Sequence, residues 1–317
     1  MTPSELKQFI RDTAINLGFS KIGAAPARRD YLAEKQFIYW LGKDYHATMR
    51  WMEQRSNERK NIRNYFPEAK SVISLALNYF TGTSPDSVDI GKISNYAWGD
   101  DYHNLIKSRL YQLLKEIKTV KPEINGIVCV DTSPIMEKNW AQKAGIGWIG
   151  KHTNLITKDF GSWVFLGEIL LNIELEYDSP FNEDLCGTCT ACLDACPTHA
   201  FPEPYVLDSS KCISYLTIEH RDNLPVEMEN TLSGWIYGCD ICQEVCPWNI
   251  KFKQISDEES FKPRNNLLER NLDEWSQLDT EEFRSLFKNS AVKRTKYEGL
   301  KRNIDLVRKS LDDNNLN

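Results

Sequence analysis

Cys186-Gly-Thr-Cys-Thr-Ala-Cys-Leu-Asp-Ala-Cys-Pro197 is the stretch of this sequence that decides its fold. Its four cysteines are separated by two, two and three residues, and proline follows the last one. A second run, Cys239-Asp-Ile-Cys-Gln-Glu-Val-Cys-Pro247, begins with the same spacing but has Val245 where a third closely spaced cysteine would stand. Cys212 lies alone between the two runs. Together they supply eight thiolates, the number that two 4Fe-4S clusters need.

The first run has the spacing of two-cluster bacterial ferredoxins, in which three thiolates hold one cubane and the fourth reaches across to the other. Because Val245 is no ligand, Cys212 must supply the missing one. We therefore expect one cluster on Cys186, Cys189, Cys192 and Cys246, and its neighbour on Cys196, Cys212, Cys239 and Cys242. A protein built in this way moves single electrons at low potential.

Zinc sites and disulfides are the other interpretations of these cysteines. A structural zinc ion usually takes two close pairs of ligands separated by a loop, whereas here four cysteines crowd one short segment. Disulfides fit less well, because such close neighbours rarely pair and nothing marks the chain for export. The spacing therefore favours iron-sulfur clusters. The ninth cysteine, Cys129, stands in an apolar run and is expected to be a buried core thiol.

The length of 317 residues is enough for roughly two domains, so the cysteine segment is only part of the protein. The opening Met-Thr-Pro-Ser-Glu-Leu has neither an arginine pair nor an apolar signal stretch, and Glu168 interrupts the longest apolar segment, Trp163 to Ile173. We expect a cytoplasmic protein without a membrane span. The net charge of -6 argues against a general nucleic-acid binder, although a local basic face is compatible with it.

Hydrophobic periodicity predicts helices that alternate with strands as far as about Ile173, and hence a layered α/β domain. Thr2 and Pro3 have the residue types of a helix start. The predicted helices span Pro3 to Leu17, Tyr31 to Met52 and Asp101 to Val120, and the predicted strands span Phe19 to Ala25, Ser71 to Phe80 and Gly126 to Val130.

Two features lie between the last predicted strand and the cysteine runs. Asp131 follows the strand, where a carboxyl group could sit in a dry pocket, keep its proton near neutral pH and donate it; a helix cap is the alternative. Gly145, Gly147 and Gly150 would let the backbone approach a bulky flat ligand, or would simply form a tight turn. Their spacing differs from that of a dinucleotide-binding loop.

Taken together, these motifs resemble the epoxyqueuosine reductase family, cobalamin-dependent iron-sulfur enzymes of tRNA queuosine synthesis. The resemblance covers nearly the whole chain. Its motifs are Arg59 before Pro67–Ile73, Tyr96–His103, Val130–Pro134, Ala144–Thr153, both cysteine runs, Lys211–Thr217 and Val292–Asn303. Longer relatives continue into helical HEAT-like repeats, and we expect this chain to be a short form without them.

The resemblance implies an α+β fold in three parts. Residues 1–175 would form a nitroreductase-like cobalamin-binding catalytic domain, 176–255 a ferredoxin-like domain with two 4Fe-4S clusters, and 256–317 a short basic helical extension that contacts tRNA. The implied reaction reduces the epoxide of epoxyqueuosine, at the wobble position of the anticodon stem-loop, to queuosine. Cob(I)alamin would be fed by the clusters, with Asp131 as the proton donor. The implied partners are tRNA and an unidentified low-potential electron donor, and we expect a monomer.

The family motifs also place residues along the cofactor. Ser94 and Leu166 are expected to contribute backbone or packing only, and Lys138 stands where some relatives have arginine. His152 is expected to be a hydrogen-bonding wall residue and not a ligand of cobalt. Tyr102 and His103 either contact the cofactor or substrate, or serve only in packing and capping. The implied cobalamin-binding residues are Arg59, Ser94, Asp131, Lys138, His152, Thr153, Asn154, Leu155, Leu166 and Ser214.

The C-terminal motif carries the predicted tRNA contact. Its cations make a compact basic stretch in which Tyr297 could stack on a base, with a solvated helix face as the alternative. The predicted tRNA-binding residues are Lys293, Arg294, Lys296, Lys301 and Arg302.

Two rival functions stay open at the level of sequence. A reductive dehalogenase also combines a corrinoid with two clusters, but usually carries a twin-arginine export signal and a tyrosine donor. A non-catalytic electron carrier would leave the large α/β domain without a purpose.

Overall fold

The computed structural model of the chain describes residues 1–82, 91–264 and 266–315. Its centre is a four-stranded sheet in the order β1-β2-β7-β4, and every neighbouring pair is antiparallel. The predicted alternation of helices and strands is therefore confirmed, but it does not produce the parallel crossovers typical of α/β folds. The strands are β1 (Lys21–Pro26), β2 (Ser71–Asn78), β4 (Gly126–Cys129) and β7 (Val164–Leu171).

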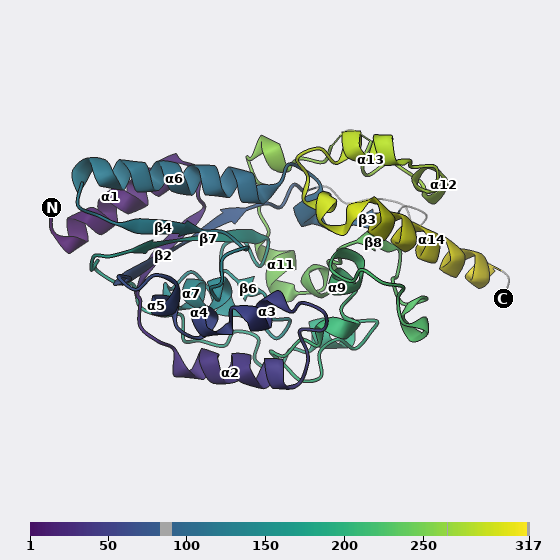
Figure 1. The fold of residues 1–317 in the computed structure, drawn as a ribbon, viewed down its shortest axis with the longest axis horizontal. Helices are drawn as coiled ribbons and strands as arrows, with labels where there is room; N and C mark the ends of the chain where they lie inside the picture. The colour runs from purple at the N-terminus through teal and green to yellow at the C-terminus, as the bar shows by residue number, and fades with distance from the viewer. Residues whose placement is uncertain (83–90, 265, 316–317) are drawn as a thin grey trace.

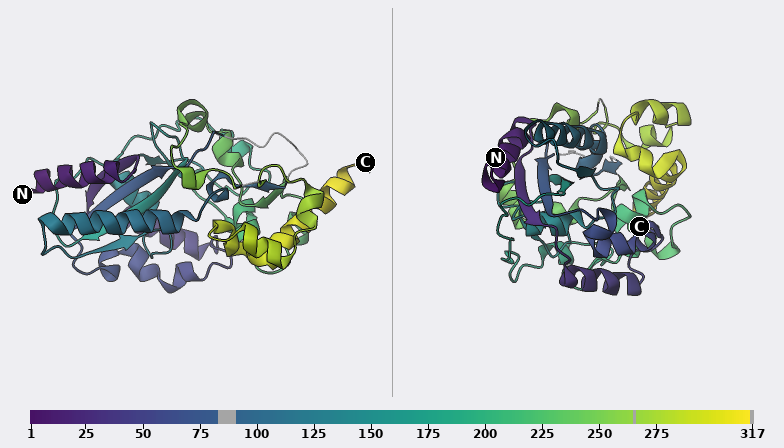
Figure 2. Two further views of the ribbon diagram at one scale, coloured as in Figure 1. Left: turned by 90° about the horizontal axis from the view of Figure 1, so that it is seen from above. Right: turned by 60° about the vertical axis from the view of Figure 1, so that its left-hand side comes forward.

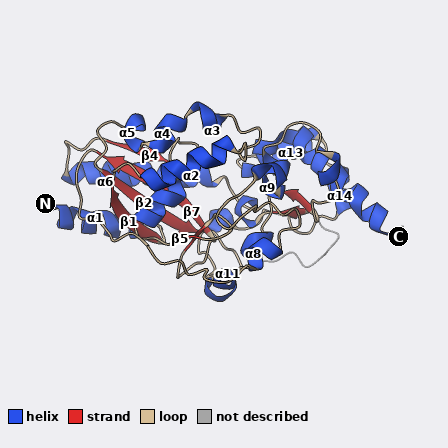
Figure 3. Cartoon of the chain, turned by 90° about the horizontal axis from the view of Figure 1, so that it is seen from below, coloured by secondary structure: helices blue, strands red, loops and turns tan. Residues whose placement is uncertain are grey.

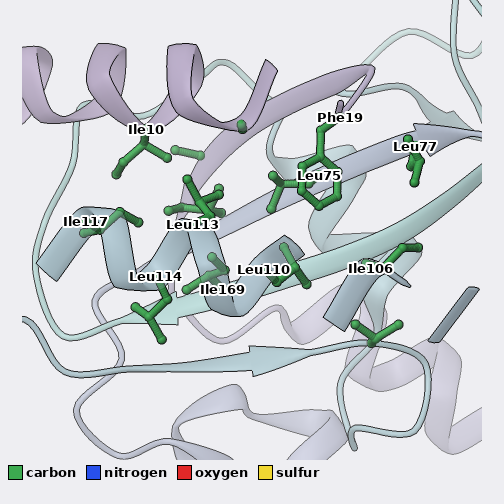
Figure 4. Packing of buried hydrophobic residues seen from close by; sticks show 14 of the residues in the cluster. Ile10, Phe19, Leu75, Leu77, Ile106, Leu110, Leu113, Leu114, Ile117 and Ile169 are labelled. Atoms are coloured by element: carbon green, nitrogen blue, oxygen red, sulfur yellow. The ribbon is translucent and has the colours of Figure 1, made fainter. Parts of the chain in front are cut away.

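Helices cover both faces of this sheet, which makes three layers (Figure 1). Side chains of β2 alternate. Ile73, Leu75 and Leu77 belong to the core under α1 (Pro3–Asn16) and α6 (Tyr102–Val120), and Figure 4 shows Leu75 and Leu77 there. Val72 and Ala76 belong to the core on the other side. A strand buried on both faces reads as a continuous apolar run, which is why Ser71 to Asn78 was recognisable in the sequence. The opposite layer holds α2 (Tyr31–Gly42), α3 (Trp51–Gln54), α4 (Ser56–Lys60), α5 (Ile62–Tyr65) and α7 (Glu137–Lys143).

Local signals set the ends of most helices. The Thr2 hydroxyl accepts from Glu5 N while the Glu5 carboxylate accepts from Thr2 N, a capping box that starts α1. The predicted single helix from Tyr31 to Met52 is wrong. It stops at Gly42, because Asp44 and Ala47 have positive φ and the chain makes a turn before α3 begins.

The second half of the molecule lies beside one end of the sheet domain and contains mainly helices, so the two termini lie at opposite ends (Figures 2 and 3). A parallel pair of β3 (Lys92–Ile93) and β8 (Trp235–Tyr237) joins it to the loop before α6. A separate two-stranded hairpin is formed by β5 (Trp148–Ile149) and β6 (Leu155–Ile156). The helices are α8 (Ala191–Asp194), α9 (Ile213–Ile218), α10 (Ile241–Glu244), α11 (Pro247–Phe252), α12 (Leu272–Ser276), α13 (Thr280–Leu286) and α14 (Lys296–Asn315).

One hydrophobic core unites this half. It contains Leu216 of α9, Tyr237 of β8, Trp275 of α12 and Ile304 of α14, all nearly inaccessible to solvent. The predicted boundary between residues 255 and 256 therefore separates segments that share one core. Within the described residues, no helix combines the length and the apolar character needed to cross a membrane.

Candidate active site and cluster-binding segment

The eight cysteines, seven in the two runs and Cys212 between them, can be grouped by which thiolate charges act on which thiol. Burial raises the pKa of Cys192, and the thiolate charges of Cys246, Cys186 and Cys189 raise it further. In the other set, burial and the charges of Cys212 and Cys196 raise the pKa of Cys239. Each set therefore consists of close neighbours, and the proximity of Cys192 to Cys242 places the two sets side by side.

Backbone amides stabilise charge on these sulfurs. Burial raises the pKa of the Cys212 thiol, while hydrogen bonds from the amides of Tyr215 and Ser214 at the start of α9 oppose that rise. Ser214 thus contacts a cysteine thiol through its backbone. Among the described residues, no three His, Cys, Asp or Glu side chains converge as they would around a single metal ion. Cys129 is fully buried in the core, as predicted.

Asp131 lies at the end of β4 in a loop with left-handed backbone (φ +46°) and a side chain that is 58% exposed. The predicted dry pocket around this carboxylate is therefore wrong, because the loop turns outward where the strand ends. The alternative of a helix cap is also wrong, since the residue that caps α7 is Met136. The Asp131 amide instead donates to the carboxylate of Glu137.

His103, at the start of α6, lies between two carboxylates. Its Nδ1 is 2.7 Å from Asp101 Oδ1, and its Nε2 is 3.0 Å from Asp131 Oδ2. Burial alone would lower the pKa of His103, but the hydrogen bonds to Asp101 and Asp131 raise it to about 9. The ring is oriented by stacking on Tyr102 at 4.0 Å, and Tyr102 itself stacks on Phe165. Asp101 caps the helix, so the capping and packing roles are confirmed, and His103 has a further contact with Asp131.

Two acids behind Asp131, one partly and one fully buried, escaped prediction. Glu137 opens α7, and burial followed by the charge of Asp131 raises its pKa. Glu168 lies on β7 without solvent exposure; its Oε1 accepts from the Ser74 hydroxyl at 3.4 Å, and its Oε2 has no partner among the described residues. Burial and the charge of Glu137 raise the pKa of Glu168. The sequence signal that could have identified Glu168 is a glutamate within an otherwise apolar strand.

The turn of the β5–β6 hairpin presents the next group of predicted residues. Lys138 Nζ donates to Thr153 O at 3.0 Å and Asn154 Oδ1 at 2.9 Å. The Lys138 side chain is exposed at its surface, yet desolvation by the surrounding protein lowers its pKa. The negative charges of Cys242, Glu137, Asp131 and Cys212 raise the same pKa and partly offset this effect. Lys138 is thus close both to the acids and to the second cysteine set.

His152 is the most buried member of this turn, at 3% exposure. Its Nδ1 accepts from Asn154 N at 3.1 Å, and its Nε2 has no hydrogen-bond partner among the described residues. Burial lowers the pKa of His152 to about 4, so the ring is neutral. The role of His152 as a hydrogen-bonding wall residue of a cofactor site stays a prediction.

The remaining predicted cofactor residues are more dispersed. Arg59 is buried, its guanidinium lies over the Trp51 ring at 5.3 Å, and the charge of Asp131 acts on it. The Ser94 hydroxyl donates to Asp240, so its side chain is used structurally. Leu155 is buried in β6, and Leu166 packs against the core from β7.

The basic C-terminal motif divides into two groups. Lys293, Arg294 and Lys296 are exposed, and the charges of two of them reach the site, because Lys293 acts on Asp101 and Asp131 acts on Arg294. The Arg294 guanidinium is also paired with Glu219 through two hydrogen bonds of 2.8 Å. The prediction that Lys301 and Arg302 are free for tRNA is contradicted. Lys301 donates to Ser276 O, and Arg302 donates to the carbonyls of Leu216, His220 and Asp222.

Tyr297 of the same motif is likewise not free to stack on a base. Its hydroxyl donates to Leu278 O at 3.1 Å, and its ring packs on Phe283.

The fold and the two cysteine runs are typical of an iron-sulfur oxidoreductase, and a separate group of carboxylates around His103 lies in its sheet domain. A family model described as a 4Fe-4S double cluster binding domain matches residues 185–249, and one described as epoxyqueuosine reductase QueG matches residues 59–132. The epoxyqueuosine reductase of Cellulophaga algicola is 43% identical over 97% of this chain and 99% of its own length. The chain belongs to the epoxyqueuosine reductase family. Membership in a family of reductases excludes the interpretation of the chain as a non-catalytic electron carrier. It gives no support to the interpretation as a reductive dehalogenase.

Solved structures agree. A crystal structure of epoxyqueuosine reductase with an epoxyqueuosine-modified tRNA-Tyr stem loop superposes with a TM-score of 0.90 at 30% identity, covering 98% of this chain and 82% of that one. The Bacillus subtilis enzyme, described with its catalytic aspartate loop swung out of the active site, superposes with a TM-score of 0.88 at 29% identity over the same shares of the two chains.

Proposed function

We propose that this chain reduces the epoxide of epoxyqueuosine, at the wobble position of tRNAs for aspartate, asparagine, histidine and tyrosine, to the alkene of queuosine. The reaction consumes two electrons and two protons and releases the oxygen as water. The observation that carries the proposal is the position of Lys138, which lies near the thiolates of Cys242 and Cys212 as well as the acids Asp131 and Glu137. Electron supply and proton supply meet there.

The cysteine sets fit two 4Fe-4S clusters, because each set offers four thiols, and hydrogen bonds from backbone amides to Cys212 favour its charged form. The residues near Lys138 fit cobalamin, because His152 keeps a free buried nitrogen and Lys138 and Asn154 present polar groups beside it. When bound, cobalamin in its cob(I) state supplies a nucleophile or single electrons strong enough to open a strained ring. The set with Cys212 and Cys242 lies nearer to this site, so electrons reach it last.

Asp131 is the proposed proton donor to the epoxide oxygen. It lies in an exposed loop, and the Bacillus subtilis relative is described as having a catalytic aspartate in a loop that leaves the active site. His103 is protonated at neutral pH and hydrogen-bonds Asp131, so it can return a proton to this carboxylate after each transfer. Asp101 holds the imidazolium in place and offsets its charge.

The tRNA anticodon loop would approach this site past Lys293, Arg294 and Lys296. Lys293 interacts with Asp101 and Arg294 with Asp131, and Lys296 is exposed beside them in the sequence, so phosphates near the wobble nucleotide can be neutralised there, chiefly by the two lysines because Arg294 is paired with Glu219. The relative solved with a modified stem loop supports the same substrate for this chain.

Anaerobic turnover tests the proposal. Protein reconstituted with iron, sulfide and cobalamin is incubated with a low-potential reductant and epoxyqueuosine-containing tRNA, and mass spectrometry follows the modified base. We expect the loss of one oxygen atom. The Asp131→Asn variant should retain eight irons and cobalamin but lose about 100-fold or more in rate, the usual contribution of a general acid. The matched control is Asp12→Asn, an exposed carboxylate on α1 that pairs with Gln8. A fully active Asp131→Asn enzyme would remove Asp131 from the mechanism.

A further inference from the structure

Lys151 connects the β5–β6 hairpin to the first cysteine run. Its Nζ donates to Gly187 O at 2.6 Å and to Cys189 O at 2.9 Å, and the residue is only 9% exposed. Both carbonyls belong to the turn that presents Cys186 and Cys189, which is closed by a hydrogen bond from Cys189 N to Cys186 O and has left-handed backbone at Gly187. The ammonium is therefore fixed against this turn by two hydrogen bonds.

The charge of Lys151 is not neutralised by a carboxylate. Among the ion pairs of the described residues, Lys151 takes part in none. A buried ammonium is costly without an opposite charge nearby. A cubane with four thiolate ligands is anionic, and it would supply that charge. The residue thus faces one of the two places in this half of the molecule where negative charge is expected to change during turnover.

We propose that Lys151 is a positioning residue that sets the reduction potential of the cluster on Cys186, Cys189, Cys192 and Cys246. It also holds the loop of that cluster against the hairpin turn that carries His152 and Asn154. The proposal rests on the cluster assignment in the proposed function. Because an added electron makes the cluster more negative, a nearby ammonium stabilises the reduced state and raises the potential. Both hydrogen bonds that Lys151 Nζ makes among the described residues go to the turn of the first run, so the other cluster, on the set containing Cys212, should keep its potential.

A redox titration followed by electron paramagnetic resonance tests this inference on anaerobically reconstituted protein. Lys151→Met removes the charge but keeps a long side chain, and Lys151→Arg keeps the charge and the donors. Lys158→Met is the matched control, because that lysine belongs to the next turn of the same hairpin but is 52% exposed and paired with Glu183. We expect one of the two midpoint potentials to become more negative in Lys151→Met, and both to stay unchanged in Lys158→Met. Lys151→Arg should restore the shifted potential at least in part.

Iron analysis separates the possible failures. Wild-type protein with far fewer than eight irons would overturn the cluster assignment itself. Wild-type and Lys151→Met proteins that both hold eight irons and have the same two midpoint potentials would overturn only the role of Lys151. Loss of about half the iron in Lys151→Met, with recovery in Lys151→Arg, would support the role in holding the loop. Loss in both variants would count against it, because arginine retains the charge and the donors.

Discussion

Two carboxylates that share one imidazole decide the protonation of the active site. Asp101 fixes Nδ1 of His103 and Asp131 contacts Nε2, and these contacts outweigh burial, so the pKa of His103 rises to about 9. The raised pKa of His103 also makes the stability of the folded state depend on pH. The protonated ring stabilises the folded state fully below about pH 6.5, the ordinary value, and this contribution is lost as the pH rises through about 9. Its upper limit is about 3 kcal/mol.

Titration of His103 by NMR of its imidazole nitrogens tests this pair. The wild-type protein should give an apparent pKa near 9, and Asp131→Asn should lower it, because one of the two charged partners is lost. The rate of epoxide reduction should fall as His103 loses its proton above that pH. A ring that titrates near 6.5 in the wild-type protein would show that the two carboxylates do not hold its proton.

The predictability of the site depends on the distance along the chain between its members. The eight cysteines were predictable because ligand spacing is a local property, and the 4Fe-4S double cluster family model covers all of them; their division into two sets stays a prediction. The contact of His103 with Asp131 was not, because it depends on how α6 and β4 pack together. The same holds for Arg302, whose positive charge in the sequence predicted a phosphate contact, but whose donors bind carbonyls of a segment about eighty residues earlier.

At the level of elements, capping residues and apolar periodicity predicted α1, α6 and the strands β1, β2 and β4 to within a few residues. The central strand β7 was noted only as an apolar segment and was not predicted as a strand. The short β5–β6 hairpin was not predictable as such, because its two-residue strands carry no periodic signal. Its glycines were visible, and the structure gives one of them a reason. A Cβ at Gly147 would lie 2.0 Å from Ile156 O, the backbone of the partner strand. Gly147 therefore permits the close approach of the two strands that carry the turn with His152.

Gly147→Ala should separate these strands and displace the turn between them. We expect a loss of about 1–3 kcal/mol in stability, the usual cost of overpacking, together with weaker retention of cobalamin. Gly42→Ala is the control, because a Cβ there meets nothing within 4 Å at the end of α2. Thermal unfolding at one fixed scan rate and the corrinoid absorbance after gel filtration measure the two effects. Equal melting temperatures and equal corrinoid content in both variants would contradict this role of the hairpin.

For the molecule as a whole, the C-terminal helices serve two purposes. Their inner face completes the core around α9 and β8, where Arg302 and the fully buried Asn303 bind backbone carbonyls. The segment that leads into α14, from Asn289 to Lys296, lies beside the candidate active site, since Asn289 O accepts from Asp101 N; Ala291 O in the same segment accepts from the Tyr237 hydroxyl. The segment that completes the core therefore also brings exposed cations to the edge of the site.

Removing two of these cations should weaken tRNA binding without disturbing the clusters. In Lys293→Gln/Lys296→Gln the affinity should fall about tenfold at low salt, and the slope of log affinity against log salt should decrease by roughly 1.5, because about two fewer counterions are released from the RNA. Lys115→Gln/Lys118→Gln makes the same charge change on the exposed face of α6 and should alter neither quantity. Fluorescence anisotropy with a labelled anticodon stem-loop, measured at several salt concentrations, gives both the affinity and the slope. If the two double variants behave alike, the segment that carries Lys293 and Lys296 does not contact phosphate. The proposed approach of tRNA past Lys293 is then wrong.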